Sequence, residues 1–364
     1  MGTKVLGTNL FSSLNIEKET KRWNQLYKII AEPKLDIIPT PRECVWKKNK
    51  TTLWYHPAKE KKHAVPIFLV YSLLNKVYIL DIGEGNSVVG GLTERGYDVY
   101  LLDWGSPGLE DSNITLDNYI LDYLEKGIKR ALRHSGAKEI SLAGYCLGGT
   151  VAAIVTSITD LPIKNLTLAA VPIDFSIGIV PDKWLEGLQK GDLSFDQFAE
   201  AHETIPSEFL YLMFRMLSPV YGSPKINLIT RAHDEEYVEK WRRMDKWTKD
   251  TASFAGAAFK QMFNDLYKDN KLLKGELVIG GKKVDLKNIT CPLFVFSCSR
   301  DTLVLEQQSL PVIDLVSSED KTYEVYDGGH VSLALTGVFA EIWDKWLSTR
   351  SIDQQKELVK LYGI

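Results

Sequence analysis

Short apolar segments alternate with amphipathic ones through residues 65–170. The segment 65–71 is a continuous apolar run, which is typical of a parallel strand buried on both faces. The segments between such runs are followed by a glycine or have the apolar spacing of an amphipathic helix, and both features indicate helices. The pattern predicts strands at 65–71, 98–103, 139–143 and 166–170, with helices at 87–95, 116–135 and 147–159. Alternation on this scale predicts an α/β fold with a doubly wound, mostly parallel sheet.

The alternation stops at about residue 173 and resumes near 289. Residues 173–288 are mostly helical in pattern, and strands return at 293–297 and 323–326 before an amphipathic helix at 339–347. A helical insertion between two sheet strands is the usual form of a cap over an active site. We therefore predict an N-terminal wrap at 1–60, a catalytic core at 61–172 and 289–364, and a cap at 173–288.

Composition narrows the class of protein without identifying it. The 364 residues are 45% apolar and 25% charged, and the net charge of −3 gives no basic field for nucleic acid. Residues 1–19 lack the pattern of a signal peptide, and the longest apolar run, 64–74, is shorter than the ~20 residues of a membrane helix. The four cysteines lack metal-binding spacing. A cytoplasmic protein without metal, cofactor or disulfides is expected.

The segment after the third predicted strand carries the clearest chemical signal. Gly144-Tyr-Cys146-Leu-Gly148-Gly149 is a G-x-S-x-G elbow with cysteine in place of serine, between a strand and a helix as the motif requires. Such a sharp turn needs glycines beside the nucleophile. A helix N-terminus also favours a thiolate. The alternative is a buried structural cysteine.

Partners for this cysteine follow two late strands. The elbow in this context predicts the α/β-hydrolase fold, in which the order along the chain is nucleophile, acid, base. Asp301 follows strand 293–297, and His330 follows strand 323–326 through a glycine pair; Asp327 is the rival acid. The other five histidines lie in polar stretches and are expected at the surface (His56, His63, His134, His202 and His233). We predict a Cys146–Asp301–His330 triad in which the imidazole takes the thiol proton.

The predicted nucleophile favours transfer from thioesters. A thiolate that attacks a thioester exchanges one thioester for another, so the acyl group stays activated for transfer to an alcohol. Backbone N–H groups of Leu147 and, provisionally, Leu73 in the loop after the first core strand are expected to bind the oxyanion. A thioesterase or dienelactone-type esterase remains an alternative, as does a non-catalytic scaffold of the same fold.

Several long motifs resemble the catalytic subunit of polyhydroxyalkanoate synthases, especially the two-subunit classes. They are the elbow, Tyr71-Ser-Leu-Leu-Asn-Lys-Val-Tyr-Ile-Leu-Asp81, Asp98-Val-Tyr-Leu-Leu-Asp-Trp-Gly105 with Gly108-Leu-Glu-Asp111, Trp241-Arg-Arg-Met-Asp-Lys-Trp247, residues 270–279 and Lys283-Val-Asp-Leu286. Similarity extends over residues 39–347. One departure is Thr302, where many members have histidine.

The resemblance implies a specific activity and specific partners. It implies polymerisation of short (R)-3-hydroxyacyl-coenzyme A units, with the growing chain on Cys146, His330 as base, and Asp301 helping to activate the substrate hydroxyl. It also implies a second synthase subunit and a polymer granule surface, with a homodimer as a further assembly. Coenzyme A enters only as part of the substrate.

Substrate contacts are expected in the first core loop and in the cap. Asn75 and Tyr78 lie in the motif after the first core strand, and Trp241 and Trp247 either line an acyl channel or are core packing. Residues 239–288 contain twelve Lys/Arg against seven Asp/Glu. This part of the cap could meet the phosphates of coenzyme A, or it could be an ordinary solvated face.

Overall fold

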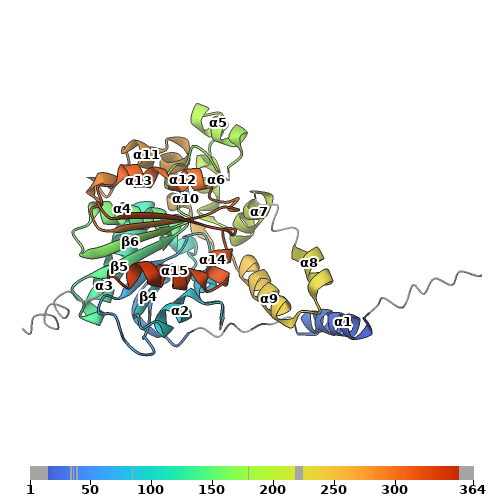
Figure 1. Ribbon diagram of the computed structural model, residues 1–364. Coiled ribbons are helices and arrows are strands. Elements are labelled where there is room, and N and C mark those ends of the chain that lie inside the picture. The colour runs from blue at the N-terminus through green and yellow to red at the C-terminus, as the bar shows by residue number, and fades with distance from the viewer. Residues whose placement is uncertain are drawn as a thin grey trace, which may run out of the picture. The chain divides into compact units, whose positions relative to one another are not determined.

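A sheet of eight strands forms the centre of the larger of two units in this chain (Figure 1). The computed structural model describes residues 15–32, 35, 37, 40–83, 85–178, 180–217 and 224–351. One unit comprises residues 38–218 and 250–364, and the other comprises residues 1–37 and 219–249. Residues 1–14, on which the targeting expectation partly depends, lie outside the described residues.

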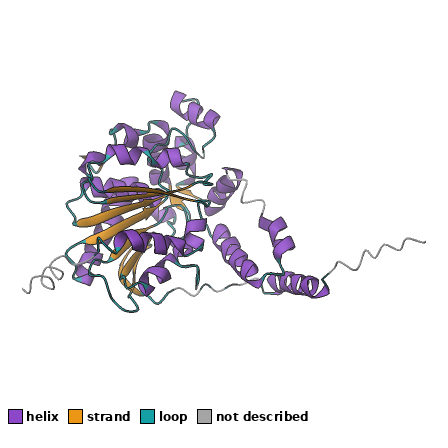
Figure 2. Cartoon of the chain, viewed as in Figure 1, coloured by secondary structure: helices purple, strands orange, loops and turns teal. Residues whose placement is uncertain are grey.

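The sheet has the strand order β1-β2-β4-β3-β5-β6-β11-β12. The six strands from β4 to β12 are parallel, whereas β1 and β2 are antiparallel additions at one edge. Figure 2 shows the strands as one continuous twisted layer. Their bounds are β1 (Glu43–Lys48), β2 (Thr51–His56), β3 (Ile67–Val70), β4 (Val99–Asp103), β5 (Ile140–Tyr145), β6 (Ile163–Ala169), β11 (Leu293–Cys298) and β12 (Lys321–Tyr326).

Helices cover both faces of this sheet, as predicted. On one face α15 (Val338–Leu347) stacks Trp346 on Phe294 of β11 and lies beside α2 (Val88–Glu94). On the other face lie α3 (Glu125–Ser135) and α4 (Leu147–Ile158), the latter against β5 and β6. Every strand residue of β3, β5 and β11 is buried, which explains why these strands are mostly apolar and do not alternate with polar residues. Shorter helices complete these layers: η1 (Val77–Leu80), η2 (Leu109–Asp111), η3 (Asn118–Leu124), η6 (Leu286–Asn288), α12 (Glu306–Ser309), α13 (Pro311–Leu315) and α14 (Ser332–Leu335).

Most of the insertion between β6 and β11 belongs to the same unit as the sheet. An aromatic cluster of Phe195, Phe259 and Phe263, with ring centroids 4.5–5.8 Å apart, holds its helices together. The elements are α5 (Asp182–Lys190), α6 (Asp196–His202), α7 (Ser207–Leu217), α10 (Gly256–Met262), η5 (Phe263–Lys268), α11 (Lys271–Lys274), and the short strand pairs β7 (Thr204–Ile205) with β8 (Phe254–Ala255) and β9 (Val278–Ile279) with β10 (Lys282–Lys283).

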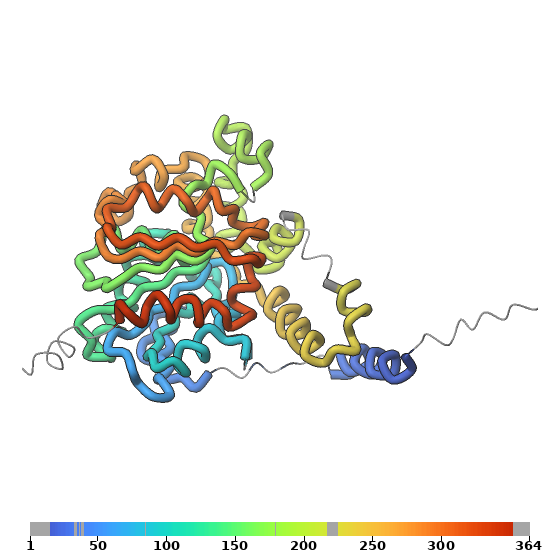
Figure 3. The backbone as a smooth tube through the Cα atoms, in the orientation of Figure 1, coloured from blue at the N-terminus to red at the C-terminus, as the bar shows by residue number. Residues whose placement is uncertain are grey.

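The described residues of the smaller unit form three helices, from two distant parts of the chain. They are α1 (Ile16–Ala31), α8 (Pro224–Arg231) and α9 (Glu235–Lys249), and Figure 3 shows the first beside the other two. Its core is the cluster Leu228, Ala232 and Val238, against which Leu26, Ile29 and Trp241 pack. Arg22 donates a hydrogen bond of 3.3 Å to the carbonyl of Thr230 and so ties α1 to the end of α8.

This division differs from the predicted one in two places. Residues 219–249, predicted as part of the cap, group with α1 instead, because their apolar side chains meet Leu26 and Ile29. Within the predicted N-terminal wrap, residues 43–56 form the hairpin β1–β2 and extend the main sheet. The hairpin is an edge addition with mixed burial, so its apolar signal is weaker than that of the central strands.

His56 corrects one surface prediction. The side chain lies at the end of β2 and is 0% exposed, not at the surface as the polar stretch around it indicated. His56 pairs in register with Val99 of β4, which is also buried, and residues paired across two strands point to the same side of the sheet. Burial lowers the pKa of His56 to about 4, although the carboxylate of Asp81 opposes this shift.

The buried imidazole should make the protein sensitive to mild acid. Because the folded-state pKa of His56 lies below its unfolded value of about 6.5, the unfolded chain binds a proton first as pH falls. The contribution to the free energy of unfolding is complete above pH 6.5. About 2–3 kcal/mol of it should be lost between pH 6.5 and 4. Urea unfolding across this range, for wild type and His56→Gln, measures the difference; parallel curves for the two proteins would contradict it.

Candidate active site

Cys146 occupies a strained turn between β5 and α4. Its backbone angles are φ 56° and ψ −133°, a combination that costs on the order of 1–3 kcal/mol for a residue with a side chain. Neighbouring glycines make the turn sterically feasible. A Cβ on Gly144 would lie 2.4 Å from the Cα of Gly149, and a Cβ on Gly148 would lie 2.4 Å from the carbonyl oxygen of Val70. The turn places a partly exposed Cys146 at the N-terminus of α4.

Asp301 and His330 come together from the ends of the last two strands. Asp301 follows β11, and His330 follows β12 through Gly328 and Gly329. The Oδ2 atom of Asp301 lies 2.6 Å from Nδ1 of His330, and both residues are buried. The other carboxylate oxygen accepts hydrogen bonds from the backbone N–H groups of Leu303 (2.8 Å) and Val304 (2.9 Å). These bonds fix the carboxylate, which in turn orients the imidazole.

The imidazole of His330 also interacts with Cys146. Burial lowers the pKa of His330, but the carboxylate of Asp301 and the sulfur of Cys146 together outweigh burial and raise it above the usual value. This electrostatic effect indicates that the sulfur of Cys146 lies near the imidazole of His330. Asp301 and His330 are thus in direct contact, and Cys146 lies close to the same imidazole. A base beside a nucleophile in this way can take its proton.

The rival acid, Asp327, lies elsewhere. Its side chain is 82% exposed and pairs with Nε of Arg300 at 3.2 Å, while Oγ of Ser299 donates to it at 3.1 Å. It helps to shape the turn after β12. Thr302, the departure from the resemblance, is an exposed residue beside Asp301.

Two backbone donors lie where an oxyanion site is expected. Leu147 is the first residue of α4, and Leu73 is buried in the loop after β3. These segments are in close contact, since a Cβ on Gly148 would also meet Tyr71 at 2.6 Å. The N–H of Leu74 donates to Oγ of Ser72 at 3.4 Å, whereas the N–H groups of Leu73 and Leu147 have no acceptor among the described residues. Their role at the oxyanion stays a prediction.

Tyr145 positions the catalytic histidine from the residue before the nucleophile. Its hydroxyl donates a hydrogen bond to the backbone carbonyl of His330, and the two rings meet edge to face with centroids 5.6 Å apart. The position before the nucleophile is variable in the G-x-S-x-G pattern, so the pattern does not reveal this contact. The contact links the strand that carries Cys146 to the loop that carries His330.

The Tyr145→Phe variant should slow turnover without weakening substrate binding. The ring contact would remain, but the buried carbonyl of His330 would lose its donor, at a cost of about 1–2 kcal/mol in stability. A looser imidazole should lower kcat several-fold while KM stays unchanged. Steady-state kinetics and urea unfolding of the two proteins test this; an altered KM with unchanged kcat would argue for a substrate contact instead.

Tyr267, in the cap, is a second residue that sequence reasoning missed. Burial raises the pKa of its phenol, and the nearby sulfur of Cys146 adds to the shift, so this ring lies close to the nucleophile. It packs edge to face on Phe175, with centroids 5.0 Å apart. In the sequence, Tyr267 stands three residues before the motif at residues 270–279, and this position is the signal that could have indicated it. Asn270 joins the two ends of the cap: its Oδ1 accepts from the N–H of Phe175 at 3.2 Å, and its Nδ2 donates to Asp174 at 2.8 Å.

The four predicted substrate contacts fall in two different units. Asn75 and Tyr78 are partly buried in the larger unit, in or before η1. Burial raises the pKa of the Tyr78 phenol, and the carboxylate of Asp250 adds to this. Trp241 and Trp247 lie on α9 of the smaller unit, where Trp241 packs against its core and Trp247 is 3% exposed. Contact of these four residues with substrate stays a prediction.

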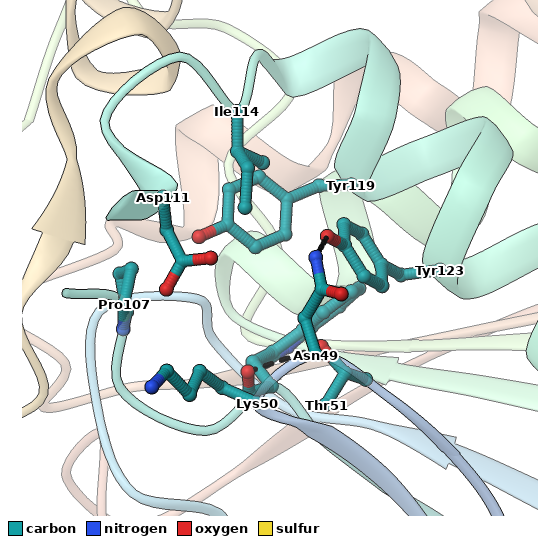
Figure 4. A pocket seen from close by; sticks show the side chains of 9 residues that line it. Asn49, Lys50, Thr51, Pro107, Asp111, Ile114, Tyr119 and Tyr123 are labelled. Carbon is teal, nitrogen blue, oxygen red and sulfur yellow. Dashed lines mark hydrogen bonds between the residues drawn. The ribbon is translucent and has the colours of Figure 1, made fainter. Parts of the chain in front are cut away.

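A small cavity between the β1–β2 hairpin and η3 is unsuited to an acyl substrate. Figure 4 shows Asn49, Lys50 and Asp111 around it, with the hydroxyl of Tyr123 accepting from Nδ2 of Asn49 at 2.9 Å. Its volume of 10 Å³ is about that of one water molecule. Within the described part of the chain, no cluster of three or more metal-ligating side chains occurs, and no helix is long and apolar enough to cross a membrane.

Comparisons with known proteins agree with this fold and site. The alpha/beta hydrolase fold family matches residues 78–335. The poly(3-hydroxyalkanoate) polymerase subunit PhaC of Haloferax mediterranei is 35% identical, over 92% of this chain and 72% of its own length. The protein of the same name from Allochromatium vinosum is 32% identical, over 87% of this chain and 90% of its own. The chain belongs to the poly(3-hydroxyalkanoate) polymerase family.

Membership in this family confirms the resemblance first indicated by the motifs and makes the chain an acyl-transferring enzyme. Solved structures confirm the α/β-hydrolase fold. A monoacylglycerol lipase from Paleococcus ferrophilus superposes with a TM-score of 0.52 at 15% identity, covering 82% of this chain and 99% of its own. An esterase from Thermogutta terrifontis gives a TM-score of 0.51 at 13% identity, covering 85% and 99%. Identities this low carry the fold and not the substrate.

Proposed function

We propose that this polymerase converts (R)-3-hydroxyacyl-coenzyme A, with short acyl chains such as 3-hydroxybutyryl, into polyester on Cys146. The single observation that carries the proposal is the 2.6 Å contact of Asp301 with His330, whose imidazole lies near the sulfur of Cys146. The named relatives support the reaction class. A cysteine nucleophile suits it, because a thioester on Cys146 keeps the acyl group activated for attack by a hydroxyl.

The proposed cycle has two transfers and needs no cofactor. In the first, His330 takes the proton of Cys146, the thiolate attacks the substrate carbonyl, and the bond from carbon to the coenzyme A sulfur breaks. His330 then gives its proton to that sulfur. In the second, a 3-hydroxyl attacks the thioester on Cys146, its proton passes through His330 to the departing sulfur of Cys146, and one ester bond forms. One coenzyme A leaves for each unit added.

Stabilisation of the oxyanion falls to backbone donors in this scheme. The N–H groups of Leu147 and Leu73 are proposed to bind the developing charge in both transfers. Tyr267, close to the sulfur from the cap side, is proposed to line the acyl site with its ring.

A second subunit is proposed to control access to Cys146. Cap residues such as Tyr267 lie close to the nucleophile, so both coenzyme A and polymer must pass the cap. A partner that binds an open cap more tightly by about 3 kcal/mol would change the open-to-closed ratio by over a hundredfold. We further propose that the complex works in the cytoplasm at the surface of polymer granules. A homodimer is the alternative assembly.

The test is turnover of 3-hydroxybutyryl-coenzyme A by the purified chain, with and without its cognate second subunit. We expect release of coenzyme A together with insoluble polyester, and a lag or weak rate that the second subunit removes. Coenzyme A release with free 3-hydroxybutyrate and no polyester would identify a thioesterase. Absence of release under both conditions would favour the scaffold, and full-rate elongation without a lag would overturn the partner.

A further inference from the structure

The indole of Trp104 joins the end of one strand to the loop that follows the neighbouring strand. Trp104 comes directly after β4 and is 4% exposed. Its Nε1–H donates a hydrogen bond of 2.9 Å to the backbone carbonyl of Tyr71, in the loop after β3. Because β3 lies between β4 and β5 in the sheet, this loop also borders the strand that leads to Cys146. Trp104 belongs to the motif at residues 98–105, which contributes no member of the triad.

The carbonyl of Tyr71 also lies against the first turn of α4. A Cβ on Gly148 would meet the carbonyl carbon and the carbonyl oxygen of Tyr71 at 2.6 Å each. The peptide after Tyr71 is therefore close to the backbone of the helix that begins beside Cys146. A peptide group is planar, so the hydrogen bond from Trp104 fixes the orientation of this whole peptide and the direction in which the loop continues.

The hydrogen bond from Trp104 is shorter than the one within the loop itself. The N–H of Leu74 donates to Oγ of Ser72 at 3.4 Å, which is beyond the usual range of N–H···O hydrogen bonds. The 2.9 Å bond from Trp104 is within that range and is buried, where hydrogen bonds are electrostatically stronger. Leu73, whose N–H is proposed to bind the oxyanion, lies two residues after Tyr71. Loss of the Trp104 donor should therefore displace this N–H.

Neighbouring residues hold the indole of Trp104 in place. Its backbone carbonyl accepts a hydrogen bond of 3.1 Å from Oγ1 of Thr51. The ring of Tyr119 meets the indole edge to face, with centroids 5.5 Å apart, and Phe254 stacks on Tyr119 at 5.7 Å. Figure 4 shows Thr51 and Tyr119 at the small cavity that the indole also lines. The direction of the indole N–H is thus set by packing before substrate binds.

Trp346 makes the same kind of hydrogen bond away from the site. Its Nε1–H donates to Oγ1 of Thr322 at 3.0 Å, and the residue is 7% exposed. Thr322 is the second residue of β12, whereas His330 follows the other end of that strand. A buried indole needs an acceptor wherever it lies, so Trp346 represents a purely structural role. It is close to Trp104 in bond length and burial and differs in what accepts the bond.

We propose that Trp104 is a positioning residue for acyl transfer, whose indole N–H sets the peptide after Tyr71 so that the N–H of Leu73 faces the oxyanion. This rests on the proposed function, which places one oxyanion donor at Leu73. Trp104 acts through the loop and not on the reacting atoms. Loss of its donor should slow the step in which charge develops on the carbonyl oxygen and leave the proton transfer from thiol to imidazole intact.

Two reactions of Cys146 separate these effects in Trp104→Phe, which keeps an aromatic ring beside Tyr119 but has no donor. Acylation by butyryl-coenzyme A, followed as the burst of coenzyme A release, passes through an oxyanion. Its rate at saturation should fall about tenfold or more, with the half-saturating concentration unchanged. In alkylation by iodoacetamide the thiolate displaces iodide from a tetrahedral carbon, and no oxyanion forms. Mass spectrometry of the Cys146 peptide should show that this rate changes by less than about twofold.

Two further proteins control for packing. Trp346→Phe removes the same donor from the other end of the sheet, and both of its rates should stay within about twofold of those of wild type. Replacement of Trp104 by β-(3-benzothienyl)alanine keeps the bicyclic shape and lacks the N–H. It should show the same loss of acylation with unchanged alkylation, even where phenylalanine loosens the packing.

Acylation at the wild-type rate in both Trp104 variants would overturn the positioning role. Equal losses of acylation and alkylation in the benzothienyl variant would also overturn it, because they would place the effect on the thiol instead of the oxyanion. In both cases wild type still gains an acyl group on Cys146, and the proposed function stands. A wild type that releases coenzyme A without ever carrying an acyl group on Cys146 would instead sink the proposed function, and the role of Trp104 with it.

Discussion

Cys146→Ala should abolish polymer formation while the protein stays folded. The alanine cannot form the acyl-enzyme, and we expect the rate of coenzyme A release to fall by a factor of about a thousand or more. Alanine is small enough for the turn at φ 56°, where the neighbouring glycines already provide the space. The free energy of unfolding should therefore change by less than about 1 kcal/mol. Release of coenzyme A and urea unfolding measure the two quantities.

Two further variants sharpen this result. Cys146→Ser should retain a small residual rate, because a hydroxyl is harder to deprotonate than a thiol and is a weaker nucleophile. Cys44→Ala serves as the matched control, since Cys44 is an exposed thiol on β1. Its rate should equal that of wild type. Near-normal turnover by Cys146→Ala would remove the basis of the proposed chemistry.

The central sheet and the elbow were accessible from sequence because their signals are local. Buried parallel strands such as β5 and β11 are buried at every position and mostly apolar, and the Gly144 and Gly148 positions of the elbow admit no Cβ without a clash. The order of nucleophile, acid and base also follows from the fold. What sequence left open was which carboxylate meets His330, and the 2.6 Å contact of Asp301 answers that.

The features that sequence missed depend on contacts between distant segments. The hairpin β1–β2 joins the sheet only through its pairing with β4, and the polar stretch around His56 gave no sign that this side chain turns inward. Residues 219–249 have the helical pattern of the cap, but their packing partner is α1, nearly 200 residues earlier. Tyr267 approaches Cys146 through the fold of the cap, which no local pattern records.

His330→Gln and Asp301→Asn should damage the two transfers to different extents. Glutamine cannot take a proton, so acylation of Cys146 and elongation should both fall about a hundredfold or more. In Asp301→Asn the imidazole remains but loses the carboxylate that orients its Nδ1 proton, which favours the wrong tautomer. A thiol is a much stronger acid and a better nucleophile than a hydroxyl, so acylation should survive within about tenfold. The substrate hydroxyl depends far more on a well-oriented base, so elongation should fall about a thousandfold.

The two transfers can be measured separately with two substrates. Butyryl-coenzyme A lacks the 3-hydroxyl, so its burst of coenzyme A release reports acylation alone, and 3-hydroxybutyryl-coenzyme A reports elongation. Asp327→Asn is the matched control, because that carboxylate is exposed and bonded to Arg300 instead of His330. It should behave as wild type in both assays. Equal losses of the two transfers in Asp301→Asn would contradict the argument that the thiol tolerates a misoriented imidazole better than the substrate hydroxyl does.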